Sequence, residues 1–518
     1  MLALARLVVV GAICVGLSAG CDAGSADGSG GSGGWFGVGN DTGPYSADAG
    51  SGYHGGGPGG GEFGATQGGV QDMTLARSLV DQGMVPPPEA FVVEAMFSEH
   101  DLPLTGQGCT HTLCLRAAMG VAPDATGIPA AWLQIGMSSI IDPDTYVRPT
   151  QTLVAVVDVS GSMSWSMSNE MSAGGLSRQL LHAITDELDG SDQFAMVTFG
   201  TTSQVELPVT SGASQQVIHS EIDALQQDGS TNMEAGIQTS IPVAQAAAGQ
   251  TDEVRIMIFS DYNPNVGATE PTEFQELVQT AADDGIGVTL FGLGLGLDPS
   301  VMKAMSEIRG ANAFSATDAS EIDALMEDSW PWMACPLAYD LRVNLQAAVG
   351  YEISASYGFP GESGAATADL EVATVFLSKR KGGMVVKLIP TAGGSIGPTS
   401  AQLKLDYLTP EGQPITNLLS ADYAGQALSA SGQYMPQIGV ARATALANLV
   451  SEMCRAAEAY AVDHATAVAI LQNALDRFVS DVAEFQDAAE LQVEIDFTQA
   501  LLTLMQADAP QGNLYGDF

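Results

Sequence analysis

The segment from Leu153 to Ser162 constrains the fold more than any other stretch of this chain. Residues Leu153 to Val157 are apolar and mostly β-branched, which predicts a strand buried on both faces of a parallel sheet. Asp158, Ser160 and Ser162 follow at alternate positions. Open α/β sheets bind ligands at the carboxyl ends of their strands. A carboxylate and two hydroxyls at such an end suit a hard divalent cation such as Mg²⁺.

Two later segments bring further oxygen-bearing side chains. The loop 229–232 precedes a helical pattern from Met233 to Ala248, so Thr231 is expected to present its hydroxyl at the start of a helix. A second apolar run, Val254 to Phe259, predicts another buried strand, and Asp261 follows it. The carboxyl ends of neighbouring parallel strands lie at one edge of a sheet, where these groups can share a ligand.

Taken together, Asp158, Ser160, Ser162, Thr231 and Asp261 resemble the metal-ion-dependent adhesion site of von Willebrand factor type A (vWA) domains, position by position. The resemblance implies a Mg²⁺ ion, with Mn²⁺ or Ca²⁺ as alternatives, bound by the hydroxyls and by the aspartates directly or through water. It also implies an open coordination position, which a protein or envelope ligand fills with an Asp or Glu carboxylate. The alternative is a domain that binds metal only for stability.

Residues 151–329 alternate between strand-like and helix-like patterns, which indicates an α/β fold with a doubly wound, mostly parallel sheet. The resemblance to vWA domains implies the same Rossmann-like arrangement. The expected strands are 153–157, 193–199, 204–209, 254–259, 286–293 and 313–315. The expected helices are 176–188, 215–225, 233–248, 273–284, 301–308 and 319–327.

The segments on either side of this domain have other patterns. Residues 73–150 are expected to form a flanking segment with short strands, including 91–93 and 131–141. Residues 330–435 alternate in short runs separated by Gly and Pro, which predicts a β-rich module. We expect strands before 150 and after 335 to pack as one β domain into which the vWA domain is inserted. Residues 436–518 predict a helical hairpin with a joint near 461–466.

The amino end resembles a bacterial lipoprotein. Residues 1–20 read as a signal peptide, with Arg6 before a short apolar run. Small residues before Cys21 resemble a lipobox, which implies cleavage, lipidation of Cys21 and anchoring of an exported protein to a bacterial membrane. An ordinary secretory signal is the alternative. Glycine fills 20 of the 48 positions from 22 to 69, so residues 21–72 are expected to form a disordered tether. The segments MVPPPEAFVVEAMFSE (84–99) and LSKRKGGMVVKL (377–388) resemble stretches of bacterial surface lipoproteins with vWA domains.

Cysteine usage agrees with export, because disulfides persist outside the cytosol. Cys109 and Cys114 are separated by four residues and are expected to close a small disulfide loop. A metal site with His111 is the alternative, although two Cys and one His make a poor zinc signal. Cys335 and Cys454 are candidates for a second bridge, which spacing alone does not establish.

The charge balance excludes some function classes. The chain has 60 acidic and 17 basic residues and a net charge of −43, so binding to nucleic acid is not expected. For the same reason we expect contact with a membrane only through the lipid anchor. The acidity suits either a saline habitat or solubility outside the cell. No acid/base pair, activated nucleophile or cofactor fingerprint is evident, so an enzyme is not expected.

Two smaller features leave alternatives open. Lys379, Arg380 and Lys381 form a basic cluster, which either caps a hairpin or binds an acidic partner. Trp165 follows the metal ligands and either borders the partner surface or packs in an extended loop. A second class of function also fits the vWA resemblance, namely a subunit of an envelope-assembly or chelatase-type complex that uses the domain as an interaction module.

Overall fold

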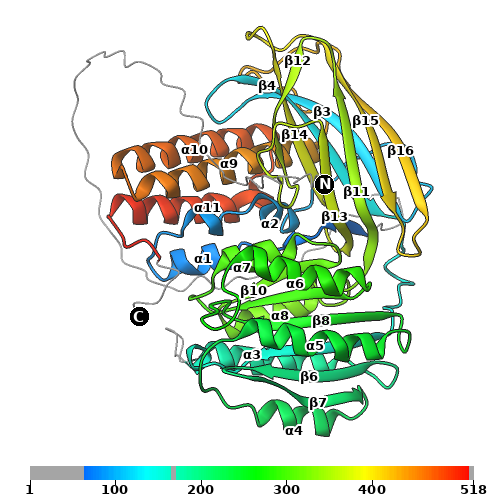
Figure 1. Ribbon diagram of the computed structural model, residues 1–518. Coiled ribbons are helices and arrows are strands. Elements are labelled where there is room, and N and C mark those ends of the chain that lie inside the picture. The colour runs from blue at the N-terminus through cyan, green and yellow to red at the C-terminus, as the bar shows by residue number, and fades with distance from the viewer. Residues whose placement is uncertain (1–62, 165–170, 513–518) are drawn as a thin grey trace, which may run out of the picture. The chain divides into compact units, whose positions relative to one another are not determined.

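Two separate sheets organise the part of the protein that the structure describes. The computed structural model describes residues 63–164 and 171–512. Figure 1 shows one sheet in the part of the chain that contains β6 and β8, and a second sheet beside the long carboxyl-terminal helices. Residues 1–20, Cys21, most of the expected tether and Trp165 lie outside the described residues.

The first sheet has seven strands in the order β2-β10-β9-β8-β5-β6-β7. All neighbours in it pair in parallel except β6 and β7, which are antiparallel. Its strands are β2 (Gly69–Val70), β5 (Gln151–Asp158), β6 (Gln193–Phe199), β7 (Ser203–Ser211), β8 (Glu253–Ser260), β9 (Gly287–Leu293) and β10 (Ala311–Ala316). The mostly parallel α/β fold expected for residues 151–329 is therefore confirmed.

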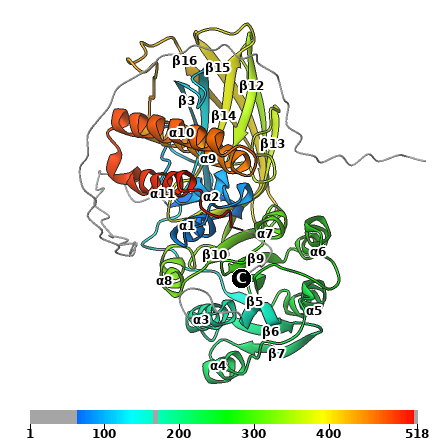
Figure 2. The same ribbon diagram turned by 90° about the vertical axis from the view of Figure 1, so that its left-hand side faces the viewer.

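Helices cover both faces of this sheet, as Figure 2 shows. Val154 and Val156 of β5 face the helices α5 (Met233–Ala247), α6 (Pro271–Asp283) and α7 (Pro299–Ser306). Leu153, Ala155 and Val157 face the helices α3 (Ala173–Asp186), α4 (Gln215–Asp223) and α8 (Ala319–Asp328). Successive side chains of a strand point to opposite faces, so a strand covered on both sides must be apolar throughout.

The second sheet has nine strands and is antiparallel. Its order is β12-β14-β4-β1-β13-β11-β15-β16, with β3 paired to β4. Strands from both sides of the first domain thus share one sheet, which confirms the expected insertion. They are β1 (Gly64–Gln67), β3 (Leu113–Pro123), β4 (Pro129–Ser139), β11 (Pro336–Ala347), β12 (Tyr351–Tyr357), β13 (Asp369–Ser378), β14 (Gly383–Pro390), β15 (Thr399–Leu408) and β16 (Pro414–Tyr423).

Three carboxyl-terminal helices replace the expected hairpin of two. They are α9 (Ile438–Tyr460), α10 (His464–Phe485) and α11 (Ala488–Gln506). The second expected helix breaks because Gln486 takes a left-handed conformation, with φ of 58°.

The strand expected at 91–93 is also wrong. The chain there forms a 3₁₀ turn, η1 (Pro88–Ala90), and then α2 (Val93–Ser98), while α1 (Thr74–Asp81) precedes both. Proline fixes φ near the helical value and so suits the first turn of a helix.

The end of the expected tether is ordered and joins the two sheets. β1 pairs with β13 in the second sheet, and β2 pairs with β10 in the first. Gly68 lies between them and donates its backbone N–H to the carbonyl oxygen of Thr374 at 2.7 Å. The boundary expected at residue 72 is therefore wrong, because residues 64–70 gain hydrogen-bond partners from strands far along the chain.

Replacing Gly68 by alanine is expected to destabilise the protein. An added Cβ would lie 2.7 Å from the backbone oxygen of Ala311, so the two sheets would have to separate slightly. Overpacking of this kind costs about 1–3 kcal/mol. Urea unfolding of Gly68→Ala measures the loss. Gly108→Ala is the control, because nothing lies within 4 Å of a Cβ at that position. Equal unfolding midpoints for the two variants would contradict the expectation.

The four cysteines within the described residues divide into one disulfide and two free thiols. Cys109 and Cys114 form a disulfide, as expected, and the bond leaves neither thiol for a metal site with His111. The expectation of a second bridge is wrong, because Cys335 and Cys454 are both free. Cys335 is buried just before β11 with its sulfur 2.6 Å from the Tyr146 hydroxyl, whereas Cys454 lies on α9 near Glu458.

The basic cluster of Lys379, Arg380 and Lys381 makes its contacts with other residues of the same chain. It occupies the turn between β13 and β14, where Lys379 and Arg380 pair with Asp328 at 2.6 and 3.0 Å. The backbone N–H of Lys381 donates to Asp101 at 2.9 Å. Since Asp328 is the last residue of α8, the hairpin turn holds the end of the first domain.

No helix within residues 63–164 and 171–512 combines the length and the hydrophobicity that crossing a membrane requires.

Candidate metal centre

Three turns meet at the carboxyl edge of the first sheet. β5 ends at Asp158, and its parallel neighbour β8 ends at Ser260, immediately before Asp261. The 3₁₀ turn η2 (Gly161–Ser164) follows β5, and the Gly161 N–H donates to the carbonyl oxygen of Gly229 at 3.0 Å. Backbone hydrogen bonds therefore hold the turn that carries the serines against the loop that carries Thr231.

Asp158 is fixed in its orientation by two donors. Its carboxylate accepts the backbone N–H of Ser160 at 2.8 Å and the Ser260 hydroxyl at 2.6 Å. The side chain is almost completely buried, with 1% exposure. A carboxylate that is both buried and hydrogen-bonded keeps one orientation, which suits a ligand that must hold its place before an ion arrives.

The two serines connect Asp158 to Asp261. The hydroxyls of Ser160 and Ser162 lie 3.1 Å apart, and the Ser162 side chain hydrogen-bonds to Asp261. The backbone N–H of Asn263 also donates to Asp261, at 3.2 Å. The turn after β5 and the turn after β8 thus bring their side-chain oxygen atoms to one place, as the spacing of the motif predicts.

Thr231 is also held by the turn that follows β8. Its N–H donates to the side-chain oxygen of Asn265 at 2.9 Å, and its carbonyl oxygen accepts the Asn265 N–H at 3.0 Å. Asn232 then caps α5 by accepting the N–H of Ala235 at 3.1 Å. Asn and Asp are preferred at this position because they satisfy a free backbone donor. The capping residue directly follows Thr231 and the helix begins at Met233, so the threonine, with 2% exposure, is placed at the edge of the site.

The electrostatics of the site favour a cation. Burial and the nearby charge of Asp261 raise the pKa of Asp158 to about 7. Burial also raises the pKa of Asp261. Two buried carboxylates that repel each other are costly unless a positive charge compensates them. Two carboxylates with three hydroxyls form an all-oxygen donor set, which hard divalent ions such as Mg²⁺ prefer. The residues present therefore fit the ion that the resemblance implies.

Two residues of the site do not stand out in the sequence. The Ser260 hydroxyl donates to Asp158 and accepts the Tyr262 N–H at 2.9 Å. Tyr262 is buried with φ of 55°, which is a strained conformation for a bulky residue. Its hydroxyl donates to the carbonyl oxygen of Ile258 at 3.2 Å. The sequence points to Ser260 only because an oxygen-bearing residue directly follows an apolar run. Nothing in the sequence indicates the backbone conformation of Tyr262.

Removing the Ser260 hydroxyl is expected to weaken Mg²⁺ binding about 10–100-fold, the usual effect of losing a group that orients a metal ligand. Isothermal titration calorimetry of Ser260→Ala with MgCl₂ measures the change. Ser240→Ala is the matched control, because Ser240 is a buried serine of the same domain that donates within its own helix, to the Ile237 carbonyl oxygen at 2.8 Å. Equal affinity in Ser260→Ala and wild type would show that Ser260 does not orient Asp158.

A second cluster of potential metal ligands already contains a cation. One ligand atom each of Glu99, His100 and Glu494 lies within 4.8 Å of the others. Arg77, however, contacts Glu99 at 2.6 Å and Glu494 at 2.8 Å. His100 contacts the same oxygen of Glu494 at 2.9 Å. Because the guanidinium compensates both carboxylates, this cluster is a structural ion network and not a metal site.

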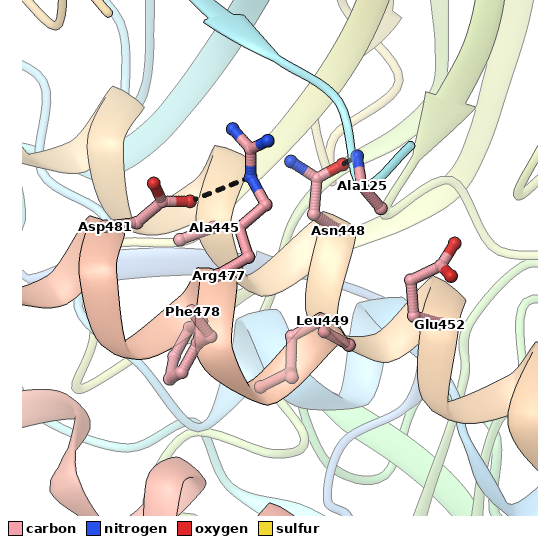
Figure 3. A pocket seen from close by; sticks show the side chains of 9 residues that line it. Ala125, Ala445, Asn448, Leu449, Glu452, Arg477, Phe478 and Asp481 are labelled. Carbon is pink, nitrogen blue, oxygen red and sulfur yellow. Dashed lines mark hydrogen bonds and ion pairs between the residues drawn. The ribbon is translucent and has the colours of Figure 1, made fainter. Parts of the chain in front are cut away.

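A small cavity lies between α9 and α10, and Figure 3 shows Arg477 beside Asp481 in its wall. Its volume is about 10 Å³, which is enough for one water molecule. It is too small to be a ligand site.

Comparison with known proteins matches the first domain to a family. Residues 152–328 match the von Willebrand factor type A domain family. "Uncharacterized protein YfbK" of Escherichia coli (strain K12) is 26% identical over 277 residues, which are 52% of this chain and 47% of that protein. Inter-alpha-trypsin inhibitor heavy chain H2 of Mus musculus is 23% identical over 202 residues, which are 38% of this chain and 21% of that protein. The chain thus spans about half of the first relative and about a fifth of the second.

Solved structures cover more of the chain at lower sequence identity. The von Willebrand factor type A protein from Catenulispora acidiphila is 14% identical, and the match covers 75% of this chain and 91% of that one, with a TM-score of 0.48. The ArnB paralog VWA2 from Sulfolobus acidocaldarius is also 14% identical, with coverages of 77% and 98% and a TM-score of 0.41.

Proposed function

We propose that this protein, whose residues 152–328 form a von Willebrand factor type A domain, binds a protein or envelope ligand through a Mg²⁺ ion. Asp158, Ser160, Ser162, Thr231 and Asp261 would hold the ion. An acidic side chain of the partner would occupy the remaining coordination position. The ion supplies the positive charge that lets an acidic protein attract an acidic group.

One observation carries this proposal, namely two buried carboxylates joined through the Ser160 and Ser162 hydroxyls, with the backbone of Thr231 hydrogen-bonded to the turn that carries Asp261. The carboxylate of Asp158 has two donors and is nearly inaccessible. Ser162 is less buried than Ser160 and Thr231, so the site faces solvent at the edge of the sheet. An interaction module needs such an edge, because its partner approaches from outside.

Capture of a partner tests the proposal. The full chain, immobilised and exposed to solubilised envelope of the parent organism, is expected to retain a partner in Mg²⁺ and release it in EDTA. The Asp158→Ala protein is expected to retain none. A partner that stays bound in EDTA and on Asp158→Ala would contradict the metal-dependent contact and would favour a subunit of a stable complex.

We also propose that a lipid on Cys21 anchors the exported protein to a bacterial membrane. The support is the sequence, with its small residues before Cys21 and the glycine-rich segment after it. An acyl anchor retains a protein by burying its CH₂ groups. Cys21→Ser is expected to move the protein from the detergent-extractable membrane fraction to the soluble fraction, measured by immunoblot. An unchanged membrane fraction would contradict the anchor.

A further inference from the structure

Two neighbouring helices of the first domain carry the same pair of side chains at the same spacing. α3 has His182 and Asp186, and α4 has His219 and Asp223. Residues four apart lie on one face of a helix, so each helix presents an imidazole and a carboxylate together. The chain has six histidines, and only these two are followed by aspartate at the fourth position. Figure 2 shows α3 and α4 side by side on one face of the sheet, where they pack against each other.

The contacts between these side chains cross from one helix to the other. The Nε2 atom of His182 lies 2.9 Å from Oδ1 of Asp223, and Nε2 of His219 lies 3.1 Å from Oδ1 of Asp186. The centres of the two imidazole rings are 4.6 Å apart, and the ring planes are nearly perpendicular, at 85°. Two imidazoles and two carboxylates thus gather in a single contact between two helices.

The histidines are more buried than the aspartates. The side chains of His182 and His219 are 29% and 31% exposed, whereas those of Asp223 and Asp186 are 70% and 63% exposed. The Nε2 atom of His219 is inaccessible to solvent and lacks an aligned hydrogen bond, although Asp186 is close to it. A buried polar atom without such a partner is costly. A ligand that accepts its lone pair would remove this cost, and a metal ion is a ligand of that kind.

We propose that these four side chains bind a zinc ion that links α3 to α4. Zinc is bound in proteins by His nitrogen and Asp oxygen, and four such ligands complete its tetrahedral shell. Imidazole suits zinc, whereas Mg²⁺ prefers oxygen ligands. With zinc–nitrogen bonds of about 2.0–2.1 Å, two imidazole rings on one tetrahedral ion have their centres about 5 Å apart. The rings in this contact are separated by a similar distance.

Binding of the ion needs only a local rearrangement. Each Nε2 atom faces a carboxylate of the opposite helix, and the ion would replace the proton between them, since zinc binds unprotonated ligands. Rotation of the exposed aspartate side chains would bring their oxygen atoms to the ion. Without an ion, the two contacts are partly exposed ion pairs, which contribute little stability. This site shares no ligand with the proposed Mg²⁺ site and does not depend on the proposed function.

Zinc titration of the full chain tests the site. Isothermal titration calorimetry with ZnCl₂ in excess MgCl₂ is expected to show one tight site in wild type. The double variant His182→Gln with His219→Gln is expected to bind zinc at least about 100-fold more weakly, because loss of a group that merely orients a ligand already costs about 10–100-fold. His464→Gln is the matched control, since His464 on α10 also contacts an aspartate, Asp508, at 3.3 Å. This control and Asp158→Ala are both expected to bind zinc as wild type does.

Thermal unfolding gives a second measurement. Zinc that binds the folded state raises the unfolding midpoint, so ZnCl₂ is expected to raise the midpoint of wild type and not that of the double variant. Equal midpoints in EDTA would show that the double variant folds. Equal zinc affinity in wild type and the double variant, or no zinc uptake by wild type, would overturn the proposal and leave two ordinary ion pairs. Loss of zinc binding in Asp158→Ala alone would place the ion at the other site and overturn it as well.

Discussion

Asp158→Ala is expected to abolish the stabilisation of this protein by Mg²⁺. In the proposed site the ion would bind the folded state and compensate Asp158 and Asp261, so Mg²⁺ is expected to raise the free energy of unfolding of the wild type. At a Mg²⁺ concentration of a hundred times the dissociation constant, the gain is about 2.7 kcal/mol. The variant lacks one of the two carboxylates, and a site with one charge and hydroxyls is too weak for a strongly hydrated ion.

Without metal the same substitution is expected to have two opposing effects on the free energy of unfolding. The pKa of Asp158, raised to about 7 by burial and by Asp261, shows that its charged form is disfavoured in the folded protein. Removing it relieves the repulsion on Asp261, although it leaves the Ser160 N–H and the Ser260 hydroxyl without their acceptor. Thermal unfolding in 10 mM MgCl₂ and in EDTA measures both effects.

The matched control for this substitution is Asp252→Ala. Asp252 is an acidic residue that precedes β8, at the amino end of the sheet, and it accepts hydrogen bonds from Thr150. Its loss should not alter the response to Mg²⁺. If MgCl₂ raises the unfolding midpoint of Asp158→Ala as much as that of wild type, the ion binds elsewhere.

Arg77→Met is expected to destabilise the protein by about 3–5 kcal/mol, the range for removing one partner of a buried ion pair. Arg77 on α1 contacts Glu99 at 2.6 Å and Glu494 on α11 at 2.8 Å. The Glu494 side chain is fully buried and also contacts His100. Without the guanidinium, the buried Glu494 carboxylate keeps only His100 as a side-chain partner within the described part of the chain.

The pH dependence of this effect has a defined sign. Arg77 and His100 hold the pKa of Glu494 at about 2, below its ordinary value of 4.5. A lowered folded-state pKa contributes stability that is present above the unfolded-state pKa and is lost as the pH falls toward 2. The difference between wild type and Arg77→Met is therefore expected to be largest above pH 5 and to shrink between pH 4.5 and 2. Urea unfolding as a function of pH measures it.

The control for the network is an exposed pair. Arg342 and Glu371 lie 3.7 Å apart with side-chain exposures of 70% and 48%. Arg342→Met is expected to cost less than about 1 kcal/mol, because solvent screens such pairs. A loss in Arg77→Met no larger than in Arg342→Met would show that the buried network contributes little.

The sequence by itself determined the first domain and its site. Continuous apolar runs such as 153–157 and 254–259 can be stable only when both faces are covered, so their pattern specified a parallel sheet between two layers of helices. Asp158 directly follows the first run, and Asp261 follows the second run after Ser260. Parallel strands bring their carboxyl ends to one edge, so strand ends alone indicated which residues would meet.

Only the tertiary structure decided how the flanking segments are used. Residues 64–70 contain little but small and polar side chains, and they become strands because β13 and β10 offer them hydrogen-bond partners more than two hundred residues away in sequence. The pairing of Lys379 and Arg380 with Asp328, and the separation of Cys335 from Cys454, likewise depend on contacts between distant segments. Local patterns carry no information on such contacts, because their energy arises only when the two sheets are in place.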